Sequence, residues 1–392
     1  MSVKLVVVPD SFKGTLSSIR ICGIIRESAE RIFPGCEVVT LPVADGGEGS
    51  VDAFLSASRS ASGTGKAGQK VIAKVTGPLF DFGKVRAGYA LIDGGRTAVI
   101  EMAACAGLPL IGDRKDPLRA TTFGVGELML DAVKKGAKRI LLCLGGSATN
   151  DGGCGAAAAC GARFYDREGK TFLPTGGTLA QIERIDLSGI RSALDGVSVT
   201  AMCDIDNPMY GEKGAARVFA PQKGADEQTV GLLDAGLVHF AGVLEKTLGK
   251  DYSSLPGSGA AGAFGGGAAA FFGASLVPGI EALLDTVRFE EAAADADLVI
   301  TGEGRLDAQS IRGKVISGVA KRTSKLGRPL IAVVGGAEDR EIGEIYSLGV
   351  SAVFTVNRLP QDLSVSAAFS EDNLRNTADN IFRLILALTP KK

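Results

Sequence analysis

Residues 139–153 read Arg-Ile-Leu-Leu-Cys-Leu-Gly-Gly-Ser-Ala-Thr-Asn-Asp-Gly-Gly, an apolar run followed by a loop that contains four glycines. An alanine-rich stretch comes next, so the segment predicts a strand, a tight turn and a helix. Gly145 and Gly146 let backbone N–H groups approach an anion, and the hydroxyls of Ser147 and Thr149 add donors. Asp151 adds a carboxylate that suits a metal ion. The loop therefore predicts phosphate chemistry.

General motif rules leave an alternative open for this loop. No Gly-Lys-Ser/Thr follows it, and it lacks the dinucleotide fingerprint, so neither common nucleotide pattern applies. An ordinary strand-to-helix loop, with Gly and Asn at positive φ, has the same composition.

Composition excludes several classes of protein. Of the 392 residues, 45% are hydrophobic and 22% charged, which is typical of a globular chain with two or three domains. Lys and Arg total 43 against 44 for Asp and Glu, so we expect no nucleic-acid partner. Seven cysteines without a CxxC pair, beside a single histidine, predict reduced buried thiols and no zinc site. That histidine, His239, lies in an expected helix with no motif around it, which disfavours a Ser-His-Asp hydrolase.

The N-terminus and the uncharged stretch 252–280 predict neither export nor a membrane span. The apolar run after Val3 is too short for a signal sequence and has no cleavage site. The uncharged stretch is dominated by Gly, Ala and Ser and is bracketed by Pro256 and Pro278, so we expect a buried glycine-rich loop and helix. A cytoplasmic location follows as an expectation.

Apolar runs alternate with amphipathic segments at both ends of the chain, which predicts βαβ order. Residues 84–89 and 97–102 instead resemble paired strands around a turn at Asp93-Gly94-Gly95. We therefore expect the α/β class with two α/β domains. Residues 1–77 plus 291–392 form a parallel-sheet, Rossmann/flavodoxin-like domain, residues 78–290 form a second domain inserted in it, and the site lies in the cleft between them.

Polar loops follow the expected strands at both ends of the chain, where open α/β sheets bind ligands. After the first strand come Asp10, Ser11 and Lys13, and the lysine suits an anion, whereas Ser17 is expected only to cap the next helix. After the second strand, Asp45 opens a glycine turn and suits a magnesium ion or a hydroxyl proton. Capping of the following helix is the alternative role of Asp45.

Two further loops carry candidate groups. Asp204 follows the apolar run 197–203, and Lys223 lies downstream near Gly224. The other loop contains Gly302, Glu303, Gly304, Arg305 and Asp307 and is followed by Lys314. Its carboxylates suit magnesium or a hydroxyl, and its cations suit a phosphate in the transition state. A surface salt-bridge cluster is the alternative for Arg305.

Together these motifs resemble the type-1 glycerate kinase family over almost the whole chain. The resemblance is carried by the stretches 9–14, 43–49, 116–124, 145–153, 219–225, 302–307 and 313–320. Two positions depart from the family pattern: Ser258, where alanine is usual, and Phe264, where a smaller residue is common.

The resemblance implies transfer of the ATP γ-phosphoryl group to D-glycerate, most often at the 2-hydroxyl, in the cytoplasm. It implies ATP and Mg²⁺ as cofactors and small molecules as partners, with no membrane or nucleic acid, and leaves a homo-oligomer open. The expected roles are phosphate or nucleotide binding by Gly145, Gly146, Ser147, Thr149, Gly302 and Gly304, charge neutralisation by Lys13 and Lys314, proton acceptance by Asp45 or Asp204, substrate binding by Asp10, Ser11, Lys223 and Arg305, and metal binding by Asp151, Glu303 and Asp307.

Two other functions stay open at this point. A kinase for another small hydroxy acid would share the phosphate loops and differ only in its pocket. A non-catalytic ligand-binding relative could keep the glycine loops without turnover.

Overall fold

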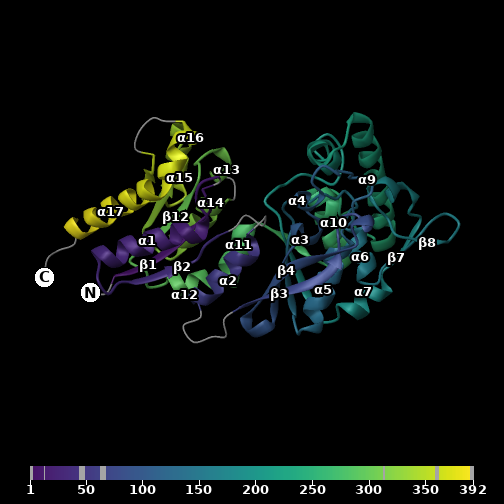
Figure 1. Cartoon of the computed structure of the whole chain (residues 1–392), viewed down its shortest axis with the longest axis horizontal. Coiled ribbons are helices and arrows are strands. Elements are labelled where there is room, and N and C mark those ends of the chain that lie inside the picture. Colours follow the sequence, from purple (N-terminus) through teal and green to yellow (C-terminus); the bar gives the residue numbers. More distant parts are fainter. Residues whose placement is uncertain are drawn as a thin grey trace. The chain divides into compact units, whose positions relative to one another are not determined.

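The computed structural model describes residues 3–12, 14–43, 49–61, 68–311, 314–357 and 362–388. It divides into two units, each an α/β structure, and so confirms the predicted fold class (Figure 1). Unit 1 comprises residues 1–45, 52–65 and 280–392, and unit 2 comprises residues 46–51 and 66–279. In the described part of the chain, no helix is both long and apolar enough to cross a membrane.

Unit 1 is built on a five-stranded sheet in which every neighbouring pair is parallel. The strand order is β14-β13-β12-β1-β2, so the N-terminal strands pair with strands from the end of the chain. Buried aliphatic side chains fill its three central strands, as a sheet covered on both faces requires. The strands are β1 (Lys4–Pro9), β2 (Glu37–Thr40), β12 (Leu298–Glu303), β13 (Leu330–Val334) and β14 (Ala352–Thr355).

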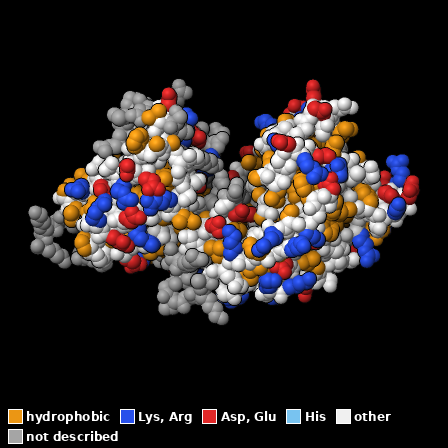
Figure 2. Space-filling view, in the orientation of Figure 1, with side chains coloured by type: hydrophobic (Ala, Val, Ile, Leu, Met, Phe, Trp, Pro, Cys, Tyr) orange, Lys and Arg blue, Asp and Glu red, His pale blue; other side chains and the backbone are white. Residues whose placement is uncertain are grey.

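Helices pack around this sheet, and the first and last of them, α1 and α17, pack against each other. Figure 2 shows acidic and basic side chains intermixed where α1 and α17 lie, and ion pairs such as Arg20 with Glu371 join the two helices. Ser17 caps α1 by accepting a hydrogen bond from the Arg20 amide, as expected. The helices are α1 (Ser18–Ile32), α2 (Ser50–Ala61), α11 (Gly279–Thr286), α12 (Phe289–Ala293), α13 (Ala308–Ile311), α14 (Val315–Lys325), α15 (Asp339–Ser347), α16 (Leu363–Ser366) and α17 (Ser370–Leu388).

Unit 2 contains a six-stranded mixed sheet of order β11-β10-β6-β5-β4-β3. The pairs from β11 to β5 are parallel, whereas β4 pairs antiparallel with β5 and β3, which confirms the predicted strand pair. Since β3 precedes residue 78 and pairs with β4, unit 2 begins earlier than the predicted boundary. The strands are β3 (Gln69–Thr76), β4 (Lys84–Ile92), β5 (Thr97–Glu101), β6 (Arg139–Cys143), β10 (Ser198–Met202) and β11 (Ser275–Val277).

Helices and a small antiparallel sheet complete unit 2. The small sheet has the order β8-β7-β9, from β7 (Arg163–Tyr165), β8 (Thr171–Phe172) and β9 (Arg184–Asp186). The glycine-rich helix α10 is buried along almost its whole length, as expected for the uncharged stretch. The helices are α3 (Ala103–Ala106), α4 (Leu108–Ile111), α5 (Phe123–Lys134), α6 (Cys154–Ala159), α7 (Ser188–Ala193), α8 (Ala215–Phe219), α9 (Glu227–Leu248) and α10 (Ala260–Phe272).

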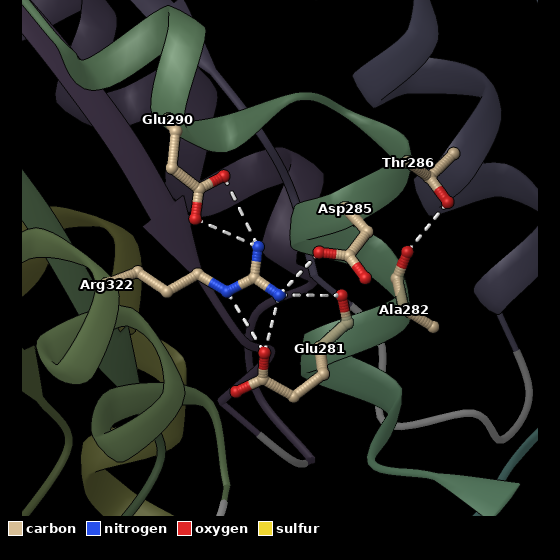
Figure 3. Close-up of polar contacts among 6 residues, drawn as sticks. All are labelled: Glu281, Ala282, Asp285, Thr286, Glu290 and Arg322. Atoms are coloured by element: carbon tan, nitrogen blue, oxygen red, sulfur yellow. Dashed lines mark hydrogen bonds and ion pairs between the residues drawn. The ribbon is translucent and has the colours of Figure 1, made fainter.

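Arg322 of α14 joins three short segments of unit 1 through its guanidinium group (Figure 3). Its Nη2 lies 2.5 Å from Glu281 Oε2 and 2.6 Å from Asp285 Oδ1, and its Nη1 lies 3.1 Å from Glu290 Oε1. The Arg322 side chain is only 13% exposed, so these bonds are better shielded from water than most surface ion pairs. The network ties α11 and α12 to α14, directly after the chain re-enters unit 1.

Replacing Arg322 by methionine is expected to lower the free energy of unfolding by about 1–2 kcal/mol, because three carboxylates lose one shared cation. Urea unfolding at 0.05 M and 1 M NaCl measures the loss, which should shrink at high salt. Arg119→Met is the matched control, since Arg119 is 64% exposed and its two ion pairs span 3.8 and 3.9 Å. Equal losses in the two variants would contradict this account.

Candidate functional site

The glycine-rich loop 145–153 connects β6 to α6 in unit 2, as the sequence predicts. It lies at the carboxyl end of a central parallel strand, where α/β sheets place their ligand sites. Gly146 is exposed, whereas Ser147 is only 6% exposed and Thr149, Asn150 and Asp151 are fully buried. The loop is therefore open to solvent at its start and closed at its middle.

The buried carboxylate of Asp151 holds this loop in shape. It accepts hydrogen bonds from the Thr122 amide and hydroxyl, at 2.8 and 2.9 Å, and from the amides of Gly153 and Gly155, at 3.1 and 3.2 Å. Burial nevertheless raises the pKa of Asp151, because desolvation disfavours the charged form. These four bonds assign Asp151 a role in fixing the loop, and magnesium binding by it stays a prediction. The role of Thr122 is one that sequence reasoning missed.

Lys223 reaches the same loop from the short 3₁₀ turn Pro221–Lys223. Its Nζ donates to Ser147 Oγ at 2.9 Å and to the Thr149 carbonyl at 2.6 Å. Burial lowers the pKa of Lys223 to about 7, against the opposing attraction of the Asp151 charge. The structure thus brings the Lys223 amine, the Ser147 hydroxyl and the Thr149 carbonyl together in one buried cluster.

Helix α10 closes the other side of the loop through contacts that only glycine allows. A Cβ on Gly267 would lie 1.9 Å from the Gly152 carbonyl oxygen, and one on Gly262 would lie 2.1 Å from that of Thr149. Residues 261–263 are all left-handed, with φ values of 55°, 68° and 69°. Two of these three residues are alanines, for which this conformation is strained. The strained turn packs directly on the middle of the loop.

Phe264 and Ser258, the two residues expected to be unusual for the resemblance, are both buried in unit 2. The Phe264 ring is fully buried, and a Cβ on Gly153 would lie 2.3 Å from it. Ser258 is also fully buried, and its hydroxyl donates to the Ser253 carbonyl at 2.6 Å. Both residues therefore contribute to the packing of the interior of unit 2.

Asp204 also belongs to unit 2 and follows β10, the strand next to β6. Its side chain is exposed, and Oδ1 accepts a hydrogen bond from the Gly279 amide at 2.8 Å. Because β6 and β10 are parallel, Asp204 and the loop 145–153 leave the sheet at the same edge.

In unit 1, the carboxyl ends of β1 and β12 bring the other predicted residues together. Pro9 pairs with Gly302, and the Asp10 amide donates to the Gly302 carbonyl at 2.8 Å. Asp10 is only 8% exposed, and its Oδ1 accepts from the Ser11 amide at 2.6 Å. A Cβ on Gly302 would lie 2.0 Å from the Val333 carbonyl oxygen, so this glycine is required for strand packing.

Glu303 is the most perturbed carboxylate of this edge. It is 5% exposed, and its Oε1 has no hydrogen-bond partner. Burial raises the pKa of Glu303 to about 7, and the negative charges of Asp10 and Asp307 add to the rise, while Lys314 opposes it. Asp307 Oδ1 accepts from the Ser310 amide at 3.3 Å at the start of α13. Three carboxylates and a lysine thus act on one another here.

Several remaining predictions have plain outcomes. Arg305 is exposed and forms an ion pair with Glu338, which agrees with the salt-bridge alternative and leaves substrate binding a prediction. His239 Nε2 of α9 lies 2.7 Å from the carbonyl oxygen of Ile182, in the segment before β9. All seven cysteines are free, and five are buried. Lys13 and Asp45 lie outside the described residues.

The two sets of residues suit phosphate chemistry in different ways. Unit 2 offers hydroxyls, glycine amides and a buried lysine, which suit an anion. Unit 1 offers carboxylates beside a lysine, although no group of three or more potential metal ligands occurs among the residues described. Magnesium commonly binds through one or two carboxylates plus substrate phosphates and water, so this donor set fits it.

Comparison with known proteins gives a consistent result along the whole chain. A model described as the glycerate kinase family matches residues 5–386. The chain is 41% identical over 380 residues to a protein named glycerate 2-kinase of Escherichia coli K12, and covers 97% of both. It is 41% identical to a glycerate kinase of Bacillus subtilis 168, again over 97% of both. A crystal structure named for a glycerate kinase 2 of Salmonella typhimurium LT2 matches with a TM-score of 0.85, 39% identity and 99% coverage of both chains.

Gly267→Ala is expected to lower the free energy of unfolding by about 1–3 kcal/mol, because the added Cβ overlaps the Gly152 carbonyl oxygen. Gly242→Ala in α9 is the matched control, since a Cβ there meets nothing within 4 Å. The control should be about 0.5–1 kcal/mol more stable than the unmodified chain. Urea unfolding measures both, and a neutral Gly267→Ala would show that the loop does not need this close approach.

Glu303→Gln tests the burial of the Glu303 carboxyl through the pH dependence of the free energy of unfolding. The folded chain binds the Glu303 proton more tightly than the unfolded chain, whose pKa is near 4.5. This group therefore adds stability at low pH that is lost as pH rises from about 4.5 to about 7. Glutamine cannot ionise, so between pH 4.5 and 8 the variant should gain about 1–3 kcal/mol relative to the unmodified chain.

Urea unfolding at each pH measures this gain. Glu168→Gln, which alters an exposed side chain between β7 and β8, is the control and should show a difference that does not vary with pH. A Glu303→Gln difference that is equally flat would mean that the carboxyl is hydrated.

Proposed function

The chain belongs to the glycerate kinase family and is a kinase, and from that premise we propose that it phosphorylates D-glycerate with ATP. The proposed products are ADP and 2-phospho-D-glycerate. One observation carries the proposal: about 40% identity over 97% of the chain to proteins named for this activity, one of them a glycerate 2-kinase.

The loop 145–153 is proposed to bind the phosphates of ATP. Phosphoryl transfer needs little covalent help from a protein, but it needs a positioned anion site. The amides of Gly145 and Gly146 and the hydroxyls of Ser147 and Thr149 are the donors of that site in our proposal. Its supports are their position at a sheet edge and the fixed shape that Asp151 imposes.

Lys223 is proposed to face the negative charge of a substrate. With a pKa of about 7, the buried amine is partly neutral in the free chain at neutral pH. An anion beside Nζ would favour the charged form and raise this pKa again. The amine would then donate to the ligand while still holding the loop.

The carboxylates of unit 1 are proposed to hold magnesium. The orphaned Oε1 of Glu303 and the nearby charge of Asp307 are the observations that support them as ligands. When bound, magnesium would neutralise charge on the ATP phosphates. Lys314 would add a second positive charge at this edge, Gly302 and Gly304 would let backbone approach the nucleotide, and Asp10, Ser11 and Arg305 would contact the substrate.

The group that accepts the hydroxyl proton is proposed to be Asp204 or Asp45. Asp204 is exposed at the same sheet edge as the phosphate loop, which supports it. Lys13 is proposed to neutralise charge on the transferred phosphoryl group.

The direct test is ADP formation by the purified chain with ATP, Mg²⁺ and D-glycerate, with the product identified by ³¹P and ¹H NMR. We expect phosphate at carbon 2. Product at carbon 3 would keep the kinase and overturn the position, and turnover only with another hydroxy acid would change the substrate. No ADP from any small hydroxy acid would refute catalysis and indicate a ligand-binding protein. Omission of magnesium should abolish turnover.

A further inference from the structure

Asn150 lies in the middle of the glycine-rich loop and has a side chain without a partner. The residue is fully buried, and neither its Oδ1 nor its Nδ2 has a hydrogen-bond partner within the chain. A buried amide left without partners is costly, so nearly all such groups are satisfied in folded proteins. Among the described residues of unit 2, Asn150 is the only one with buried side-chain polar atoms in this state.

The neighbours of Asn150 show that the cluster is otherwise well satisfied. The Thr149 carbonyl, on the peptide bond that joins Thr149 to Asn150, accepts from Lys223 Nζ at 2.6 Å. The next residue, Asp151, accepts four hydrogen bonds. The strained turn at Ala261–Ala263 packs on the Asn150 backbone, where a Cβ on Gly262 would lie 2.5 Å from its Cα. The surrounding structure therefore holds Asn150 in place at some cost.

We propose that Asn150 is a specificity residue that binds the α-hydroxy carboxylate group of the substrate. An amide offers an acceptor oxygen, Oδ1, beside the NH₂ group of Nδ2, which donates. An α-hydroxy carboxylate offers the matching pair: before transfer its hydroxyl donates to Oδ1 and its carboxylate accepts from Nδ2, and the hydroxyl proton passes to Asp204 or Asp45 only as the phosphoryl group arrives. This inference rests on the proposed function and names the part of the substrate that the site reads.

Two other ligand groups match the cluster less well. A fully ionised phosphate has acceptors only, so it would satisfy Nδ2 and leave Oδ1 unpaired. An adenine base offers both a donor and an acceptor, but it is neutral and would add no negative charge beside the buried Lys223 amine. An α-hydroxy carboxylate supplies the donor, the acceptor and the negative charge together.

Only the start of the loop is exposed to solvent. Gly146 is exposed and Gly145 partly so, whereas Ser147 and Lys223 are nearly buried. Because Asn150 is fully buried in the free chain, binding of a ligand at its amide requires the surrounding side chains to move. A site that recognises its substrate by pairing a buried polar group discriminates strongly against analogues that lack the partner.

Asn150→Leu tests the proposal, because leucine has nearly the same shape and no polar atom. We expect KM for D-glycerate to rise about tenfold or more, KM for ATP to stay within twofold, and the melting temperature without substrate to stay equal or rise. The rise in melting temperature is expected because two unpaired polar atoms are removed. A lower melting temperature with unchanged KM would overturn the proposal and indicate an internal water as the partner.

Competitive inhibition gives a second, sharper readout. In the unmodified chain, D-lactate, which keeps the α-hydroxyl, should inhibit at least tenfold more strongly than 3-hydroxypropionate, which lacks it. In Asn150→Leu the two inhibition constants should agree within twofold. A preference retained in the variant would show that another residue reads the hydroxyl.

Two controls separate this proposal from the others. Asn207→Leu removes an amide that donates to the Lys213 carbonyl at 2.8 Å, so its melting temperature should fall. If Asn150→Leu does not fold, Asn150→Ser replaces it with the same expectations for KM. If the unmodified chain makes no ADP, the proposed function fails first. Calorimetric titration of D-glycerate into both chains, with and without a non-hydrolysable ATP analogue, then still decides the role of Asn150.

Discussion

The buried carboxylate of Asp151 is the interaction on which unit 2 depends. It collects donors from Thr122, which precedes it by 29 residues, and from two amides that follow it. A carboxylate in this setting costs desolvation energy, and its hydrogen bonds offset that cost only if all donors keep their places. The loop, the start of α5 and the start of α6 are therefore fixed as one body. A phosphate-binding loop benefits from this rigidity, because preorganised donors need no rearrangement when the ligand arrives.

Several glycines of unit 2 are needed because two backbone segments pack there without room for a Cβ, rather than because the chain must be flexible. At Gly262 and Gly267, the carbonyl oxygens of the loop occupy the space that a Cβ would take. The same demand appears in unit 1, where Gly302 lies against the Val333 carbonyl. The uncharged, glycine-rich composition of 252–280 thus has a structural cause: α10 must lie backbone to backbone with the loop that it supports.

The local sequence pattern predicts the helices and strands well, but it predicts less of the burial and the contacts of the site residues. Apolar runs predict the strands before the loops at Asp10, Ser147 and Glu303, because each is a short apolar stretch followed closely by glycine or a carboxylate. The burial of Asp151 and Asn150 was not predictable, because it depends on Thr122 and on α10, which are distant in sequence. The strained turn 261–263 has no sequence signal, since two of its residues are alanines that normally avoid this conformation.

Three polar groups among the site residues lower the stability of the folded chain when no ligand is bound. Burial shifts the pKa of Lys223 down and that of Glu303 up, each to about 7, and Asn150 lacks hydrogen-bond partners. Each shift opposes the charge that the group would carry in water, so the folded chain loses stability for each of them. Ordinary core positions avoid such groups, and natural chains keep them mainly where a ligand later supplies the missing charge or partner. The buried polar cluster of unit 2 is therefore better explained as a binding surface than as part of the core.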